Sequence, residues 1–124
     1  MTKYFSVDEA NALLPRLKVL LEQVLAARER IIDSRSQWEP IMEQASGNGG
    51  GQHGKPLYQD TDKIQLTLAQ FDEWGIVLKD VDSGLVDFPH MRNGREVYLC
   101  WRLGEARVAY WHDVDTGFAG RQPL

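Results

Sequence analysis

Apolar residues in the first third of the chain recur at alternating steps of three and four residues, as on one stripe of a helix. The stripe consists of Leu14, Leu17, Leu21, Val24, Ile31, Trp38 and Met42. Ser6 followed by Glu9 fits a capping box, so we expect this helix to begin at Val7. The regular alternation is typical of a coiled-coil seam.

Four residues interrupt this pattern. Arg28 and Arg35 fall on the same seven-residue repeat as Leu14, where their aliphatic stems can cover the seam while their charged ends reach its edge. Pro15 lacks an amide hydrogen and predicts a bend or a restart of the helix. Pro40 predicts a second bend or an early end.

The expected helix is long for its domain. A helix from residue 7 to about 45 would measure roughly 58 Å, whereas a compact domain of this size has a radius of gyration near about 14 Å. Its apolar seam would extend beyond its own domain and need a partner. A second copy of the chain about a two-fold axis is the simplest partner, so we expect a homo-oligomer, with a homodimer first.

Residues 46–56 contain all the glycines of the first half of the chain and predict a flexible loop. Asp60 is a good N-cap for a second helix, which carries Ile64, Leu68 and Phe71 on one stripe and ends at Gly75. Residues 6–75 therefore predict an antiparallel helical hairpin.

After Gly75 the apolar period changes to strict alternation. The predicted strands are 76–78, 85–88, 96–103 and 106–112. Asn93-Gly94 is a strong signal for a tight turn and Gly104-Glu105 a weaker one. We predict a single α+β domain in which the long two-helix hairpin packs on a small antiparallel β-meander over 76–113, followed by a tail over 114–124.

The two turns also predict a register. The first pairs Asp87 with Cys100, and the second pairs Leu99 with Tyr110. The helix-facing side then holds Val86, Phe88, His90, Val97, Leu99, Trp101, Val108, Tyr110 and His112, and the other side holds Asp87, Tyr98, Cys100, Arg102, Arg107, Ala109 and Trp111. Arg102 would lie opposite Arg107, which is unfavourable. Moving the second turn by one residue removes this repulsion but breaks the apolar pairs, so we retain the first register.

Composition narrows the class of protein. The 124 residues include 14 Lys plus Arg, 18 Asp plus Glu and one Cys, for a formal net charge of -4. One Cys excludes an intrachain disulfide scaffold. Without an apolar run of membrane length or a basic leader we expect a cytoplasmic protein with no membrane segment. The acidic balance disfavours nucleic acid as a partner.

The glycine-rich segment contains two nucleotide-binding spacings. Gly49, Gly51 and Gly54 match the dinucleotide fingerprint, and Gly49 through Lys55 nearly match a P-loop. Both motifs require a preceding strand, whereas a helix is predicted here, and Pro56 occupies the position of the magnesium-binding hydroxyl. We interpret the segment as a linker.

Two acidic motifs are interpreted as solvated turns. Asp115-Thr116-Gly117 is the triplet of aspartic proteases, but seven residues after it cannot supply the enclosing strands. Asp80 and Asp82 lack the later ligands of a calcium loop.

In the retained register, neither Cys100 nor the histidines His90 and His112 are placed to form a catalytic or metal site. Cys100 and His112 lie on opposite faces and could meet only in the shifted register, and Asp87 beside Cys100 would raise the pKa of the thiol. His90 and His112 are roughly 10 Å apart, too far for one metal ion without a further ligand such as Glu9 or Asp72. We therefore expect an inert cysteine and assign no metal ligand.

The sheet face that carries Asp87 and Cys100 mixes charge with aromatic surface. Such a face can bind a small anionic or planar ligand, contact a second chain, or be a solvated surface with an ion pair between Asp87 and Arg102. Arg92, Arg95 and Arg121 can extend a basic rim.

Several blocks of the sequence resemble a known family. They are Tyr4-Phe5-Ser6, 9–15, 84–89, 94–105, Trp111-His112 and 117–121. With these the chain resembles the bacterial domain-of-unknown-function family numbered 2203. The resemblance implies a small bacterial protein with a helical front half. The family's recurrent polar positions would map onto Asp87, Arg95, Cys100, Glu105, His112 and Arg121.

Two function hypotheses follow. The first is a homo-oligomeric binding or interaction module without catalytic activity. The alternative is an enzyme or a metal-dependent small-ligand site around Asp87, Cys100, Glu105 and His112. The candidate ligand-binding residues are Asp87, Arg95, Tyr98, Cys100, Arg102, Glu105, Trp111, His112 and Arg121, and no cofactor is assigned.

Overall fold

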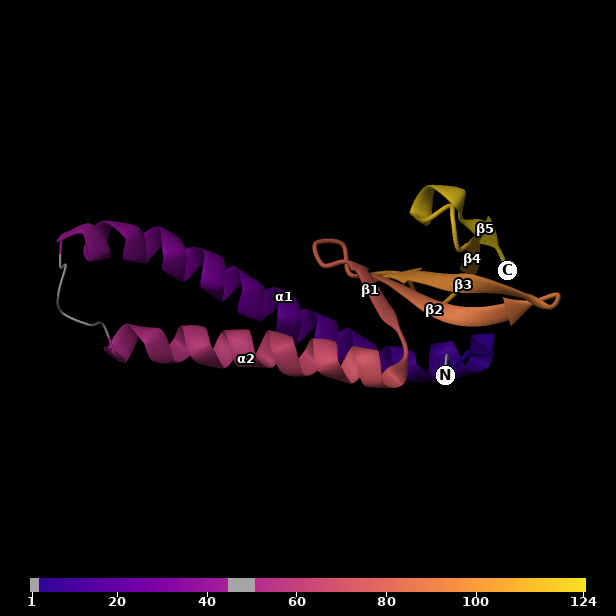
Figure 1. Ribbon diagram of the computed structural model, residues 1–124, viewed down its shortest axis with the longest axis horizontal. Coiled ribbons are helices and arrows are strands. Elements are labelled where there is room, and N and C mark those ends of the chain that lie inside the picture. The colour runs from indigo at the N-terminus through magenta and orange to yellow at the C-terminus, as the bar shows by residue number, and fades with distance from the viewer. Residues whose placement is uncertain (1–2, 45–50) are drawn as a thin grey trace.

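The chain folds as a long helical hairpin joined to a small antiparallel sheet (Figure 1). The computed structural model describes the backbone of residues 3–44 and 51–124 and the side chains of residues 3–34 and 58–124. The elements are α1 (Val7–Gln44), α2 (Gly51–Trp74), β1 (Val77–Asp80), β2 (Leu85–Arg92), β3 (Arg95–Arg102), β4 (Tyr110–Asp113), the 3-10 turn η1 (Phe118–Gly120) and β5 (Gln122–Pro123). The predicted α+β class is confirmed.

The first helix begins where the capping box predicts. The backbone N–H of Glu9 donates to the Ser6 hydroxyl and the N–H of Ser6 donates to the Glu9 carboxylate, each at 3.0 Å. These bonds, first of all the one from the Ser6 backbone, lower the pKa of Glu9. Of the alternatives expected at the two prolines, a restart at Pro15 and an early end at Pro40 are wrong, because α1 is continuous to Gln44. Leu14 and Leu17 are buried on either side of Pro15, and this packing outweighs one lost backbone hydrogen bond.

The second helix begins earlier than predicted. It starts at Gly51 rather than near Asp60, so the part of the expected loop from residue 51 to 56 is helical, while residues 45–50 lie outside the described residues. Asp60 is not an N-cap. It is 7% exposed and accepts hydrogen bonds from Arg30 of α1 at 2.7 and 3.0 Å. This ion pair ties the two helices together.

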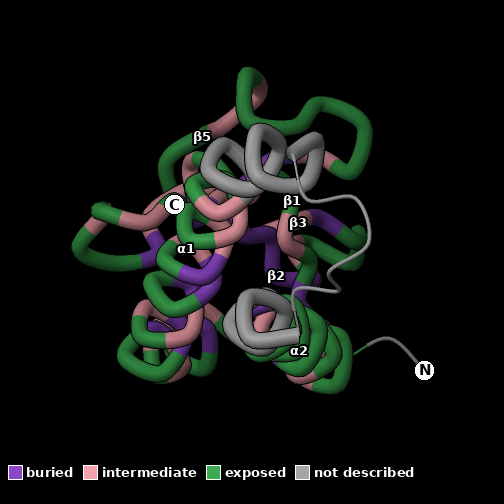
Figure 2. Tube along the Cα trace, turned by 90° about the vertical axis from the view of Figure 1, so that its left-hand side faces the viewer, coloured by how far each residue is buried: buried purple, intermediate pink, exposed green. Residues whose placement is uncertain are grey.

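The part of the predicted seam from Leu14 to Val24 is buried within the chain itself. Leu14, Leu17 and Leu21 are buried in one cluster with Phe71 of α2 and the sheet, and the buried stripe of α1 is visible in Figure 2. Farther along, Arg28 pairs with Asp82 of the β1–β2 turn. The side chains of Arg35, Trp38 and Met42 lie outside the described residues. This stretch of the seam is therefore buried by the chain's own helix α2 and sheet, and the expected homo-oligomer stays a prediction.

The five strands follow one another in the order β1-β2-β3-β4-β5, all antiparallel. The predicted β2–β3 register is confirmed: Asp87 pairs with Cys100, and Asn93 and Gly94 form the turn at φ 52 and 76°. The face toward the helices buries Val86, Phe88, Val97, Leu99 and Trp101 completely.

The predicted β3–β4 register is wrong by one residue. Leu99 pairs with Trp111 and Cys100 with Tyr110, and β4 covers only Tyr110–Asp113 instead of 106–112. The reason is Val108, which is buried and donates its backbone N–H to the Asn11 side chain of α1 at 2.7 Å. Because α1 binds this backbone, pairing with β3 starts only at Tyr110.

A shift of one residue exchanges the two faces of β4. Tyr110 and His112 leave the helix-facing side, where we expected them, and join Cys100, whereas Trp111 turns into the core. His90 stays on the helix-facing side, with its Nδ1 2.6 Å from the Phe5 carbonyl oxygen.

The tail forms part of the fold. β5 pairs with β4 as a fifth strand, and the preceding residues cross the Cys100 face of the sheet (Figure 1). The Arg121 guanidinium lies 4.2 Å from the ring centre of Tyr110 and 4.6 Å from that of Phe118. This covers a face that the sequence presented as a possible solvated surface.

Candidate metal centre

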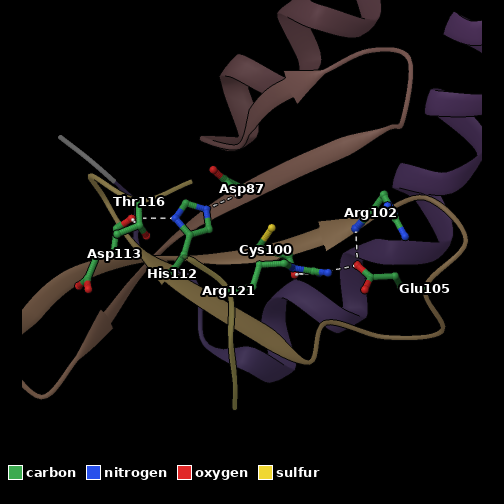
Figure 3. Close-up of polar contacts among 8 residues, drawn as sticks. All are labelled: Asp87, Cys100, Arg102, Glu105, His112, Asp113, Thr116 and Arg121. Atoms are coloured by element: carbon green, nitrogen blue, oxygen red, sulfur yellow. Dashed lines mark hydrogen bonds and ion pairs between the residues drawn. The ribbon is translucent and has the colours of Figure 1, made fainter. Parts of the chain in front are cut away.

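Three neighbouring strands each place one potential metal ligand at the same point of the sheet. Asp87 of β2, Cys100 of β3 and His112 of β4 are 1%, 0% and 2% exposed. One ligand atom from each lies within 4.8 Å of the other two (Figure 3). The sequence interpretation had separated His112 from Cys100, and the one-residue shift of β4 brings them together.

The ring of His112 is oriented by the turn that follows it. Nδ1 lies 2.7 Å from the carbonyl oxygen of Asp113, which also accepts from the N–H and the hydroxyl of Thr116, each at 3.2 Å. A carbonyl oxygen only accepts hydrogen bonds, so Nδ1 carries a proton. The other nitrogen, Nε2, points at Asp87.

The contact between His112 and Asp87 requires a cation. Nε2 and Asp87 Oδ1 are 3.0 Å apart and buried. With Nδ1 protonated, a neutral ring offers only a lone pair at Nε2, and an ionised carboxylate offers only lone pairs. Either a further proton or a metal ion must therefore lie between the two groups.

Cys100 is not set up as a nucleophile. Burial raises the pKa of its thiol to about 12, the Asp87 carboxylate adds to the rise, and Arg121 opposes it. His112 presents Nε2 to Asp87, so it is not positioned as a base dedicated to the thiol. Nucleophilic catalysis would need the opposite environment.

The burial of Cys100 predicts an unreactive thiol in the metal-free protein. At pH 8 we expect labelling by a disulfide reagent to be at least 100-fold slower in the native chain than in urea, because the thiolate is scarce and covered. Stopped-flow absorbance measures both rates on the same sample. Equal rates would contradict the buried position of the thiol.

A second polar group lies beside these three residues. Arg121 Nη2 donates to Glu105 Oε1 at 2.6 Å and to the Cys100 carbonyl oxygen at 3.2 Å. Glu105 also accepts from the backbone N–H of Arg102 at 2.7 Å, and its carbonyl oxygen accepts from Trp101 Nε1 at 3.0 Å. This network fastens the C-terminal segment over the sheet (Figure 3).

The network makes stability depend on acid pH. Burial alone would raise the pKa of Glu105, but hydrogen bonds from Arg121 and Arg102 and the charges of both arginines hold it below its usual 4.5. A lowered folded-state pKa means that this stabilisation is present above about pH 4.5 and is lost as the pH falls through the folded value.

Comparison with Glu105→Gln tests this dependence. At pH 7 we expect the variant to unfold with about 1–2 kcal/mol less free energy than the wild type. The difference should shrink as the pH is lowered below 4.5 in urea titrations. A difference that stays constant with pH would contradict the ion pair.

The donor set fits a transition metal of the zinc class. Thiolate, imidazole and carboxylate are the ligands zinc takes in proteins, and tetrahedral geometry separates their ligand atoms by roughly 3.3–3.6 Å. Closing a spread of up to 4.8 Å requires side-chain movements of about 1 Å. The His112 N–H bonded to a backbone carbonyl is the usual outer contact of a metal-bound histidine.

The remaining candidate residues divide between two places. Tyr98 lies on the same face, its ring centre 5.6 Å from that of His112, and Arg102 lies over Phe118 at 5.4 Å. Arg95 and Trp111 are on the other face. Glu105 is held by Arg121 and Arg102 and is not one of the three clustered ligands.

Two residues that support the site were missed in the sequence. Asp113 contributes a backbone carbonyl and Thr116 a hydroxyl. A backbone carbonyl cannot be predicted as an acceptor from the side-chain pattern, because every residue has one. The repulsion expected between Arg102 and Arg107 was the one signal for the correct register. These arginines are not paired in the structure, since residue 107 precedes β4.

A family model described as an uncharacterized conserved protein, DUF2203, matches residues 3–124. The chain belongs to the DUF2203 family. The match spans α1, α2 and the whole sheet, so Asp87, Cys100 and His112 all lie inside the family region. No curated protein and no solved structure matches the chain.

Within residues 3–44 and 51–124, neither helix combines the length and the apolar character that crossing a membrane requires.

Proposed function

We propose that this protein binds one divalent metal ion of the zinc class through Asp87, Cys100 and His112. The observation that carries the proposal is the convergence of three different ligand types from three adjacent strands at a buried point. The orientation of His112 supports it, because Nδ1 is held by a carbonyl and Nε2 is directed to the other ligands.

The ligand chemistry favours zinc over magnesium or calcium. Magnesium and calcium prefer oxygen ligands, whereas sulfur and nitrogen suit zinc and its transition-metal neighbours. Binding displaces a proton from Cys100 and places positive charge where Nε2 and Asp87 require a cation. The ion also joins β2, β3 and β4, so binding adds to stability.

The number of ligands points to a metal-dependent small-ligand site. Three protein ligands are typical of zinc sites that leave a fourth position for water or a small molecule. Arg121 holds the Cys100 backbone and restricts this side of the sheet. The proposal develops the alternative hypothesis drawn from the sequence, a metal-dependent small-ligand site. Glu105, which that hypothesis placed in the site, now supports the site by binding Arg121.

Calorimetric titration with Zn²⁺ tests the proposal. Chelator-treated wild type should bind about one equivalent, and Cys100→Ser or His112→Gln should weaken binding at least 100-fold, as expected for loss of one of three ligands. His90→Gln is the matched control, because His90 lies on the opposite face. Circular dichroism checks that each variant is folded.

Two results would contradict the site. One is a wild type that takes up no Zn²⁺. The other is a His90→Gln variant that loses as much affinity as His112→Gln, which would place the ion elsewhere.

We also propose self-association through the outer groove of the hairpin. A groove of about 520 Å³ between α1 and α2 is lined in part by Val19 and Leu66, which are 52% and 70% exposed. A second copy is the partner present at equal concentration, and a two-fold axis would pair groove with groove. Light scattering should measure the mass of a dimer for the wild type and of a monomer for Val19→Glu. A wild type that is monomeric at 100 µM would contradict this proposal.

A further inference from the structure

A separate pocket lies at the end of the β2–β3 hairpin, beside β4. Its volume is about 470 Å³, and it is lined by Arg92, Asn93, Arg95 and Trp111. Trp111 belongs to the helix-facing side of β4, whereas the neighbouring His112 points to the opposite side. The pocket and the metal centre are therefore on different faces of the sheet.

Arg92 is held by a cation–π contact rather than by an ion pair. Its guanidinium carbon is 4.7 Å from the ring centre of Trp111, which is only 8% exposed and therefore fixed in the core. Among the side chains of residues 3–34 and 58–124, no carboxylate pairs with Arg92. Its N–H groups are thus available to an anion, and the contact with Trp111 limits where the guanidinium can lie.

Arg95 supplies a second guanidinium at the same place. It is the direct cross-strand partner of Arg92, next to the tight turn of Asn93 and Gly94. Arg95 Nη2 contacts Asp113 at 2.8 Å, and both side chains are partly exposed. Two positive charges directly across a hairpin repel, and one carboxylate offsets only one of them.

A tetrahedral oxyanion matches these donors. Two guanidinium groups present several N–H donors in forked geometry, which suits the oxygens of phosphate better than a single carboxylate. The Asn93 side chain at the rim adds a neutral polar group. We infer that this pocket binds the phosphate group of a small molecule, with Arg92, held over Trp111, as the first phosphate-binding residue and Arg95 as the second.

Titration with inorganic phosphate, followed by proton–nitrogen NMR at constant ionic strength, tests the inference. Phosphate should shift the Trp111 indole N–H and the Arg92 side-chain N–H, and acetate should bind at least fivefold more weakly. Arg92→Gln and Arg95→Gln should each weaken phosphate binding about tenfold. Arg92→Lys should also weaken it severalfold, because lysine keeps the charge but lacks the planar fork.

Arg107→Gln is the matched control, since Arg107 is exposed and lines a different pocket. Its phosphate affinity should equal that of the wild type. Shifts that are absent, equally strong for acetate, or unchanged in Arg92→Gln would overturn the inference. The pocket and the metal centre share no residue, so Cys100→Ser should lose metal binding but bind phosphate normally. Failure of one proposal therefore does not decide the other.

Discussion

Replacing Trp101 with Ala should lower the free energy of unfolding by about 3–5 kcal/mol, the range seen for large aromatic residues deleted from cores. Trp101 of β3 is completely buried on the helix-facing side of the sheet, and its indole N–H donates to the Glu105 carbonyl oxygen at 3.0 Å. The substitution therefore leaves a cavity and an unpaired carbonyl next to the Arg102–Glu105 turn. Urea denaturation of both proteins measures the loss.

Trp74→Ala provides a matched comparison. Trp74 is partly exposed at the end of α2, stacked on Phe71 with ring centres 6.1 Å apart. We expect this deletion to cost about 1–2 kcal/mol, because less apolar area returns to water. Equal losses for the two variants would contradict the central place of Trp101 in the core.

Breaking the contact between Asp87 and His112 should cost about 3 kcal/mol in the metal-free protein. Each side chain is 2% exposed, and they meet at 3.0 Å. Asp87→Ala leaves the buried histidine without its partner, and His112→Leu leaves the buried carboxylate without its partner. Either change therefore leaves an unpaired polar group in the interior. Urea titrations in the presence of a chelator isolate this effect from metal binding.

The double variant separates the pair from the two single deletions. Removing both groups leaves no unpaired buried charge. We therefore expect the double variant to lose about 1–3 kcal/mol less unfolding free energy than the sum of the two single losses. Purely additive losses would show that the two groups do not depend on each other. Asp87→Asn, which keeps the volume and one acceptor, should be milder than Asp87→Ala.

Local signals in the sequence predicted much of the fold. The Ser6–Glu9 box, the stripe from Leu14 to Val24 and the Asn93-Gly94 turn act over a few residues, and all three are confirmed. The family resemblance is confirmed over residues 3–124. It had also singled out Asp87, Cys100 and His112, which the structure brings together.

The errors arose where distant parts of the chain override local preference. Asp60 has the chemistry of an N-cap, but Arg30 from the other helix binds it inside α2. Gly104-Glu105 suggested a two-residue hairpin between β3 and β4. The Asn11 side chain of α1 instead accepts a hydrogen bond from the backbone of Val108, and pairing of β4 with β3 starts only at Tyr110. A contact nearly one hundred residues away along the chain thus decided the face on which His112 lies.

This dependence explains why the candidate site was hidden. In the retained register Cys100 and His112 lay on opposite faces of the sheet and could not bind the same metal ion, so the metal-dependent hypothesis had no geometry to support it. The observed register places one ligand on each of three adjacent strands. The repulsion between Arg102 and Arg107 in the retained register was the physical signal for the shifted register. It proved a better guide to the pairing of β3 with β4 than the apolar pairs.

Cobalt substitution tests most directly whether the three side chains form a metal centre. One equivalent of Co²⁺ added to the chelator-treated protein should produce a near-ultraviolet band from a cobalt–thiolate bond and intense visible bands of a four-coordinate ion. Cys100 is the one cysteine in the sequence, so the near-ultraviolet band should vanish in Cys100→Ser and persist in His90→Gln. A wild-type spectrum indistinguishable from that of Cys100→Ser would contradict the metal centre.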